Sequence, residues 1–487
     1  MSMTSALSPS SGLPGTRPAA TAVGTAPEAA QPEAAAPESA QPEAAAPEAA
    51  QASTGTLRGI TVEWPAVPDT QGLLEYLVRD DVLCWVRREG GLAGFGEVAR
   101  FTASGPDRFQ RAAEWWRGLQ AGADIDNQVG GPGTGPVAFG SFAFSYTSSH
   151  SSRLVVPEVL VGLDGDRAWL TYLTYDGDAQ LSAATAEAAL AAWMEEISVE
   201  RSPDPADSLV PGQVSEQAYM DAVAAGVERI QAGKLSKLVV ARDVVANLST
   251  PIATAQVLRE LAARYTDCWT YSVDGLIGST PEMLIKVENN VARARVLAGT
   301  LDRSRTQNRA GESDTDYAQR VLAGSDKQRH EHQIAIDSLT RKLEPFTTAM
   351  TSHSEPFVLE LPNVWHLASD VSAELAHDAG QPPSSLELAE AVHPTAAVCG
   401  TPTEVAGALI RELEQMDRGP YAGPVGWTDG AGNGEWGIAL RGAVVESPQQ
   451  VRLYAGCGVV DGSDPQAELA ETWAKFRPMI EALGLRR

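Results

Sequence analysis

The chain has 487 residues, 43% of them hydrophobic, and a formal charge of −26 that comes from 37 Lys and Arg against 63 Asp and Glu. Proteins that bind nucleic acids or anionic membranes carry basic surfaces, so we expect neither partner for so acidic a chain. No run of 18 apolar residues occurs, and the sequence therefore predicts no membrane-spanning helix.

The four cysteines, Cys84, Cys268, Cys399 and Cys457, lie far apart and form no C-x-x-C pair. This spacing indicates neither a disulfide framework nor a zinc site. The N-terminus also lacks the basic region and apolar core of a signal peptide. Together these features predict a protein of a reducing compartment, and we expect it in the cytoplasm.

Residues 1–55 form a low-complexity segment of Pro, Glu and Ala in which "QPEAAAPESA" is followed by "QPEAAAPEAA". No large apolar residue stands between Val23 and Leu57, so this segment cannot bury enough surface to offset its ordering entropy. The prolines that recur every five residues also interrupt any helix. We expect a disordered tail here.

From residue 56 the pattern mixes strands and helices. Strands are predicted at 59–64, 82–88, 153–163 and 167–175, and amphipathic helices at 109–120 and 184–197. Between them lies "GGPGTGPVAFGSFAFS", a glycine-rich loop entering a buried strand. It is not a P-loop, because the Gly-Lys-Ser/Thr ending is missing.

After a polar connection at 199–215, a helix is predicted to start at Ser215 and end at Gly233. Strands follow at 237–245, 269–280 and 283–300, then long polar helices within 314–344, and further strands at 363–375, 423–446 and 450–460. The region 423–446 contains a Gly-Asn-Gly turn, which is typical of a hairpin. Strands in antiparallel pairs with helices in separate blocks favour an α+β fold over alternating βαβ units.

Three charged side chains each allow two interpretations, a purely structural role and a role in chemistry. Lys237 begins an apolar strand, where an edge lysine reaching water is the simpler interpretation. Glu282 follows Pro281 between apolar flanks, and a carboxylate there either faces solvent or is buried with a raised pKa. Glu331 stands between two histidines in "RHEH", which is not the H-E-x-x-H motif of zinc proteases, and a charged helix face is the simpler interpretation.

The stretch "SDPQAELAETWAKF" places Glu468, Glu471 and Lys475 on one face of a predicted helix. Asp464 can cap this helix and Pro465 suits its first position. Two carboxylates one turn apart repel each other, so the arrangement needs a reason. A solvated face with one Glu471–Lys475 ion pair is the simplest reason, and the rest of the chain decides whether it holds.

Eight blocks occur in an order that resembles the chorismate-utilising enzymes, the superfamily of isochorismate, salicylate, anthranilate and aminodeoxychorismate synthases. The resemblance is strong over 215–487 and loose over 56–200, where only "GPVAFGSFAFS" matches. The strong blocks are "KLVVAR", "GSTPEMLIKV", "LAGT", "SDKQRHEHQ", "VWHLASDV", "HPTAAVCGTP", "RGPYAGPVGWTDGAGNGEWGIALRGA" and "LYAGCGVVDGSDPQAELAETWAK".

The resemblance implies a single catalytic domain, residues 56–487, with two large antiparallel sheets packed face to face and helices outside. It implies Mg²⁺ held by Glu331, Glu468 and Glu471, which would explain the paired carboxylates, since this hard cation prefers carboxylate oxygens, water and a substrate oxygen. By motif, the substrate chorismate is expected to meet Gly299, Thr300, His366, Arg441, Gly458 and Lys475.

The family members differ in the nucleophile that attacks the substrate ring. Aminodeoxychorismate synthases resemble one another in a nucleophilic lysine at the position of Ala298. Water-using members carry a lysine at the position of Lys237 as general base, and Glu282 matches the family's general acid. A lysine serves as a base near neutral pH only where its surroundings lower its pKa.

These matches predict an isochorismate synthase, an isomerase that adds water at C2 of chorismate and removes the C4 hydroxyl, with Mg²⁺ as its cofactor. A salicylate synthase, which also eliminates pyruvate, is the alternative, and Lys237 argues against an anthranilate-type subunit with a glutaminase partner. We expect a monomer. Isochorismate is the first product of the menaquinone, siderophore and salicylate routes alike.

Overall fold

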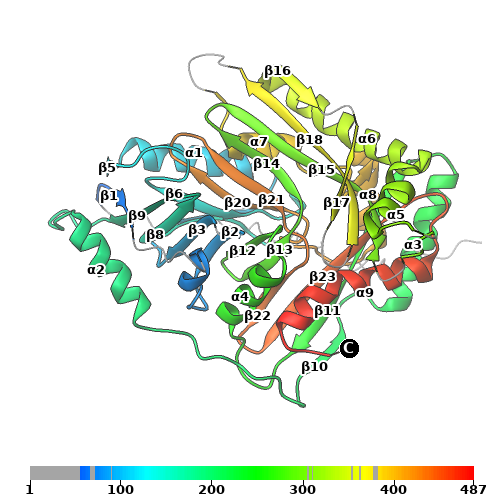
Figure 1. Ribbon diagram of the computed structural model, residues 1–487, viewed down its shortest axis with the longest axis horizontal. Coiled ribbons are helices and arrows are strands. Elements are labelled where there is room, and N and C mark those ends of the chain that lie inside the picture. The colour runs from blue at the N-terminus through cyan, green and yellow to red at the C-terminus, as the bar shows by residue number, and fades with distance from the viewer. Residues whose placement is uncertain are drawn as a thin grey trace, which may run out of the picture. The chain divides into compact units, whose positions relative to one another are not determined.

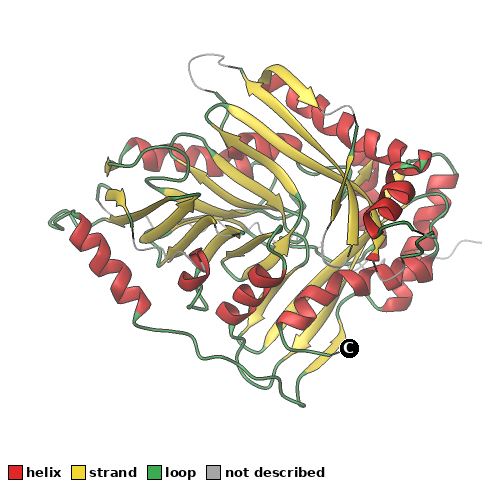
Figure 2. Ribbon diagram, viewed as in Figure 1, coloured by secondary structure: helices red, strands yellow, loops and turns green. Residues whose placement is uncertain are grey.

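Two large β-sheets form the framework, with helices on their outer faces (Figures 1 and 2). The computed structural model describes residues 55–65, 72–88, 90–303, 306–309, 311–352, 355–360, 364–376 and 382–486; within these ranges, the side chains of Ala298, Thr300, Asp302, Lys327 and Glu331 lie outside the description. The predicted tail, residues 1–55, lies outside the described residues except for Gly55. The division into a tail and one domain stays a prediction.

The larger sheet has 13 strands in the described chain, and β19 (Gly400–Thr401) joins it beside β11. All neighbouring strands pair antiparallel except β1 and β5, which pair in parallel, a detail that the sequence pattern did not predict. In order across the sheet, the other strands are β10 (Ser208–Pro211), β11 (Lys237–Asn247), β23 (Gln450–Val459), β22 (Gly442–Ser447), β13 (Leu276–Thr280), β12 (Trp269–Val273), β2 (Leu83–Arg87), β3 (Gly90–Phe95), β8 (Val159–Asp164), β9 (Arg167–Thr174), β1 (Arg58–Glu63) and β5 (Asp124–Asn127).

The second sheet has ten described strands, with β17 (Phe357–Glu360) pairing beside β18. The predicted hairpin at 424–438 is confirmed as β20 and β21, which the Gly-Asn-Gly turn connects. In order, the other strands are β16 (Thr347–Ser352), β18 (Val364–Leu375), β15 (Val291–Asp302), β14 (Met283–Glu288), β21 (Gly434–Ile438), β20 (Pro424–Asp429), β6 (Val137–Ser141), β7 (Ser152–Val156) and β4 (Ala99–Ala103).

The two sheets pack face to face through an aromatic core. Trp85 of β2 and Trp269 of β12 come from the larger sheet, and Phe139 of β6 and Trp427 of β20 from the other. Burying such rings is a main source of fold stability because each removes a large apolar area from water. Both sheets contain strands from before residue 200 and after residue 215, since β2 pairs with β12 and β6 with β20.

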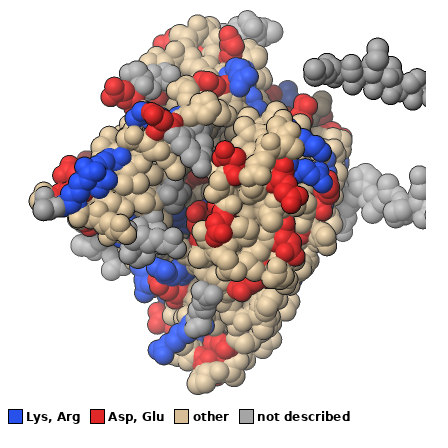
Figure 3. Space-filling model, turned by 90° about the vertical axis from the view of Figure 1, so that its right-hand side faces the viewer, with Lys and Arg blue, Asp and Glu red and all other residues tan. Residues whose placement is uncertain are grey.

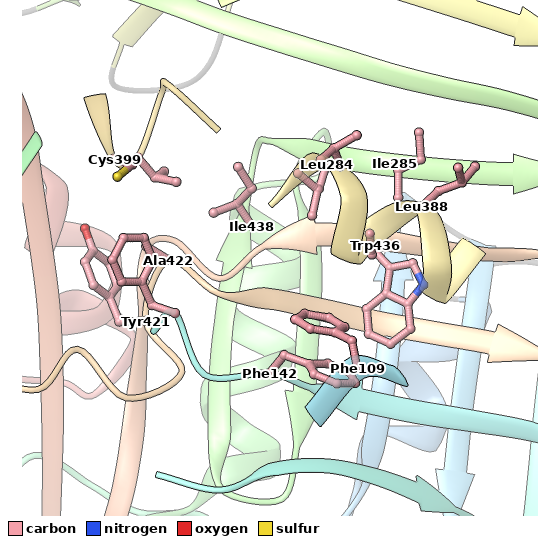
Figure 4. Close-up of a cluster of buried hydrophobic side chains, with 14 of the residues drawn as sticks. Phe109, Phe142, Leu284, Ile285, Leu388, Cys399, Tyr421, Ala422, Trp436 and Ile438 are labelled. Carbon is pink, nitrogen blue, oxygen red and sulfur yellow. The ribbon is translucent and has the colours of Figure 1, made fainter. Parts of the chain in front are cut away.

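The helices cover the outer faces, as the α+β prediction requires. On the larger sheet lie α2 (Ala183–Met194), α3 (Glu216–Gln231), α4 (Thr254–Arg264), α8 (Thr403–Leu413) and α9 (Pro465–Ala482). On the second sheet lie α1 (Arg108–Ala121), α6 (Asp326–Leu343) and α7 (Ser385–Val392). Figure 4 shows one such contact, between Phe109 of α1, Phe142 and Trp436 of β21. The ring centroid of Phe142 lies 4.1 Å from that of Phe109 and 5.7 Å from that of Trp436.

Local sequence signals fix the starts of helices α3 and α9, and α9 carries candidate site residues. Ser215 caps α3 by accepting a hydrogen bond from the amide of Ala218. The predicted start of α9 is confirmed, because the side chain of Asp464 accepts a 2.9 Å hydrogen bond from the amide of Ala467 and Pro465 is the first helical residue. Caps of this kind fix where the first turn of the helix begins.

The structure adds two features to the predicted elements. The polar connection at 199–215 contains a short strand, β10, which pairs with β11 although its side chains give no clear alternation. The helical region 314–344 is divided into α5 (Asp314–Ala318), a π-helical turn η3 (Gln319–Ala323) and α6. The helices of the described chain include none long and apolar enough to cross a membrane.

Candidate active site

A cavity of about 410 Å³ opens where β11, β23 and the start of α9 lie side by side (Figure 1). Strands β15 and β18, the turn before β14 and the loop residues at 397–398, 418–422 and 440–441 also line it. The structure places nine of the predicted site residues around it: Lys237, Glu282, Gly299, His366, Arg441, Gly458, Glu468, Glu471 and Lys475. Thr300 lies in β15 and Glu331 in α6, and the side chains of both are outside the described residues.

Lys237 begins β11, and its side chain passes over the backbone of Gly458 in the neighbouring strand β23. A Cβ atom on residue 458 would stand 2.9 Å from Lys237 Cε, which is closer than real Cβ contacts. Glycine at 458 therefore leaves room for the lysine. Arg242, five residues further along the strand, points away from the cavity and stacks against Trp473 and Phe476 of α9.

Glu282 lies in the turn between β13 and β14 and is 7% exposed. Burial raises the pKa of its carboxyl to about 7, and the positive charges of Lys237, Lys475 and Arg441 limit the rise. The reading of Glu282 as a solvent-facing residue at the start of a strand is therefore wrong. A carboxyl group with this pKa is partly protonated near neutral pH and can donate a proton.

Gly299 marks a β-bulge in β15, where the pairing with β18 shifts by one residue. Its φ of +83° lies in the left-handed region that favours glycine. The carbonyl of Gly299 accepts a hydrogen bond from His366, whose Nε2 lies 3.2 Å from an Arg441 nitrogen. Burial lowers the pKa of His366 to about 3, so the neutral ring accepts from Arg441 and fixes the direction of that guanidinium.

Glu468, Glu471 and Lys475 project from one face of α9, as predicted, but this face lines the cavity. Lys475 Nζ lies 2.8 Å from Glu471 and donates to the carbonyl of Gly456. Burial opposes its charge, but the carboxylate of Glu471 favours it, and the net effect raises the pKa of Lys475. The predicted Glu471–Lys475 ion pair therefore forms, but it lies on the wall of a cavity and not on a solvated face.

The donor atoms of this face fit Mg²⁺. Ligand atoms of Glu468, Glu471 and Cys457 all lie within 4.8 Å of one another. Burial raises the pKa of the Cys457 thiol well above its usual value, and a protonated thiol is no ligand for a hard cation. Two carboxylates beside an open cavity leave the other coordination positions to water and substrate oxygens, which is the usual pattern for this cation.

Several lining residues were not predicted, although most lie in the quoted blocks. Tyr421 and Tyr454 stack with centroids 5.3 Å apart and bring an aromatic wall to the cavity. Arg418, 3% exposed, pairs with buried Glu414 and donates to the carbonyls of Val239 and Val398. The sequence did not predict that Arg418 donates to the carbonyls of both Val239 and Val398, because these residues lie far apart in the chain.

The chain is similar to known proteins along most of its length. The family model described as chorismate binding enzyme matches residues 49–484. Isochorismate synthase DhbC of Bacillus subtilis is 38% identical over 282 residues, which are 55% of this chain and 68% of DhbC. The salicylate biosynthesis isochorismate synthase of Pseudomonas aeruginosa is 31% identical over 419 residues, 82% of this chain and 84% of that protein.

Solved structures show the same fold. The crystal structure of DhbC from Bacillus anthracis superposes with a TM-score of 0.66 at 29% identity and covers 85% of this chain and 99% of that one. Anthranilate synthase component I from Streptococcus pneumoniae superposes with a TM-score of 0.64 at 19% identity, covering 81% and 92%. The predicted α+β fold of two packed sheets is thus confirmed, and the chain belongs to the chorismate binding enzyme family.

Proposed function

We propose that this protein is an isochorismate synthase, which converts chorismate reversibly to isochorismate. The observation that carries the proposal is the meeting of Lys237 and the buried, partly protonated Glu282 in one cavity with a carboxylate face and two further cations. Two of the relatives named isochorismate synthase support it over most of the chain, since one covers 82% and the other 85% of it.

The reaction needs one base and one acid. Lys237 takes a proton from the water that forms the new C2–O bond, and the ring double bonds shift as the C4–O bond breaks. Glu282 gives its proton to the departing C4 oxygen, which leaves as water. One water enters and one leaves, so product and substrate are isomers and no organic cofactor is needed.

Cations in the cavity suit a substrate with two carboxylates. Arg441, held by His366, and Lys475, held by the carbonyl of Gly456, are both fixed by neighbours before a ligand arrives. Fixed donors cost little reorganisation when the substrate binds. We assign these two side chains to the substrate's carboxylates, and Gly299 and Thr300 to backbone contact with it.

Mg²⁺ belongs to the proposal as the resident cofactor, held by Glu468, Glu471 and Glu331. When bound, it supplies positive charge that lets an acidic wall accept an anionic substrate. Without it, Glu468 and Glu471 would repel the substrate's carboxylates, so EDTA should silence turnover. Isothermal titration with Mg²⁺ alone measures the site without relying on activity, and Glu471→Gln should weaken that binding.

Product analysis tests the assignment directly. With chorismate and Mg²⁺ the purified protein should release isochorismate, with only traces of salicylate and pyruvate, and added ammonium should give no anthranilate. Stoichiometric salicylate and pyruvate would move the assignment to a salicylate synthase. Ala298 stands where the aminodeoxychorismate synthases have their nucleophilic lysine, so a covalent amine route is not expected.

The proposal includes a cytoplasmic monomer that works without a glutaminase subunit. In support, the four cysteines are all buried and free, as expected in a reducing compartment. Figure 3 shows acidic and basic side chains spread over one face, without a continuous basic surface on its described part. Analytical ultracentrifugation tests whether the protein is a monomer. Turnover by the purified chain alone tests whether it works without a glutaminase subunit.

A further inference from the structure

A second cavity, of about 840 Å³, lies beside the catalytic one and is formed by other parts of the chain. It is open to solvent and is lined by the start of α1, the loop 144–149, the end of α7 and helix α8. Among the described residues the two cavities share only Arg418. The volume falls in the range of small-molecule sites, and the proposed reaction makes no use of it.

Arg108 brings a buried positive charge to this cavity, and no carboxylate of the described chain is paired with it. The side chain is 7% exposed, and its terminal nitrogens donate to the carbonyls of Gly105 and Ala143 at 3.3 and 3.1 Å. Its Nε has no hydrogen-bond partner, and Arg108 forms no ion pair within the described chain. A buried guanidinium without a carboxylate is costly unless a ligand balances it.

The other charged groups of the cavity are already balanced or solvated. Glu414 is buried but pairs with Arg418. Glu390, Glu404 and Asp417 are exposed. Arg411 is likewise exposed to solvent. Glu390 is the opposite charge that acts on Arg108, but it is exposed and forms no ion pair with it. Among the described lining residues, Arg108 is therefore the one buried charge without a paired carboxylate, and a ligand with a single negative charge would match it.

Aromatic rings line the same cavity. Phe144 and His393 meet edge to face with centroids 5.7 Å apart, and Phe109 lies 6.5 Å from His393. Phe109 is in turn stacked on Phe142, which holds its ring in place (Figure 4). His393 Nε2 donates to the carbonyl of Phe144, which leaves the other ring nitrogen as an acceptor. Such walls bind planar apolar rings by stacking and edge contacts.

We propose that this second cavity binds a small aromatic monocarboxylate, with its carboxylate at Arg108 and its ring among Phe109, Phe144 and His393. The site is distinct from the catalytic cavity and does not depend on the proposed function. Its occupant would nevertheless be close to the catalytic wall, because Arg418 lies 4.3 Å over the ring of Phe144 and holds the carbonyls of Val239 and Val398.

Fluorine NMR of 4-fluorobenzoate with the full chain tests the proposal, because this probe reports weak binding. Gly407 lines the cavity from α8, and a Cβ there would meet only Cys399 Sγ at 3.8 Å and an Arg411 nitrogen at 3.9 Å. Gly407→Leu should project a side chain into the cavity while keeping the helix, since leucine is the better helix former. Ala408→Leu adds a leucine at the next, exposed position and is the matched control.

We expect saturable broadening of the probe signal in the wild type and in Ala408→Leu, and binding at least about tenfold weaker in Gly407→Leu, equivalent to about 1.4 kcal/mol. Arg108→Met should weaken binding similarly, and Lys475→Met in the catalytic cavity should not. No saturable binding to the wild type, equal binding by both leucine variants, or loss of binding in Lys475→Met alone would each overturn the proposal.

Discussion

Lys237 Cε lies only 2.9 Å from the position that a Cβ atom on Gly458 would take. The two residues are on neighbouring strands and 221 positions apart in the chain, so the glycine serves the lysine only in the folded state. The contact is with the far end of a flexible side chain, which can move aside at little cost to the fold.

Gly458→Ala should therefore lower turnover while leaving stability nearly unchanged. Displacing Lys237 Nζ by about 1 Å would cost about 10²-fold in kcat, the usual effect of such misplacement. Steady-state kinetics and thermal unfolding measure both quantities. Gly118→Ala on α1, where a Cβ would have nothing within 4 Å, is the control and should keep full activity. Equal kcat in both variants would contradict the role of Gly458.

Lys237→Gln should abolish water addition and preserve Mg²⁺-dependent binding of chorismate. The amide keeps the length and polarity of the side chain but cannot take a proton, and loss of a general base typically costs about 10²–10⁴-fold in rate. Stopped assays for isochorismate together with calorimetric binding separate the two effects. Turnover within about threefold of the wild type would show that Lys237 is not the base.

Glu282→Gln should reduce kcat by about 10²–10⁴-fold, because the amide cannot protonate the departing oxygen. In the wild type, chorismate turnover should fall as pH rises through about 7, since Glu282 loses its proton there. A pH profile of kcat/KM measures this basic limb. Glu288→Gln, at the other end of β14, should retain near-wild-type activity, and a flat wild-type profile between pH 6 and 8 would exclude Glu282 as the acid.

Glu282→Gln should also stabilise the fold at alkaline pH. Burial raises the carboxyl pKa from 4.5 in the unfolded chain to about 7, so the folded wild type loses stability as pH rises between these values. The shift corresponds to about 3 kcal/mol once both states are ionised. Urea unfolding at pH 5 and pH 8 should show the advantage of the variant growing with pH. An equal advantage at both values would disprove the linkage.

Deleting residues 1–50 should leave activity intact, because the Pro-Glu-Ala repeat has no large apolar side chain with which to join the core. The truncated protein should match the full chain in kcat, KM and melting temperature. A truncated protein that turns over poorly or precipitates would show that the segment contributes to the fold or the site.

Much of the site could be predicted from the sequence, because its parts are local. Asp464 and Pro465 set the start of α9, and the spacing of Glu468, Glu471 and Lys475 then places all three on one face. Helix periodicity, strand alternation and the hairpin turn at 431–434 depend on neighbours along the chain, which is why the elements and the α+β class followed from the sequence and the family blocks.

Only the tertiary structure decided which charged side chains are buried and which face solvent. Whether Glu282 meets solvent depends on strands from distant parts of the chain, and its burial, which sets its pKa, cannot be read from its neighbours in sequence. The same holds for Arg418, which joins carbonyls of Val239 and Val398, and for Arg108, buried without a carboxylate. Burial and electrostatics are properties of the space around a side chain, and that space is filled by residues the sequence does not place together.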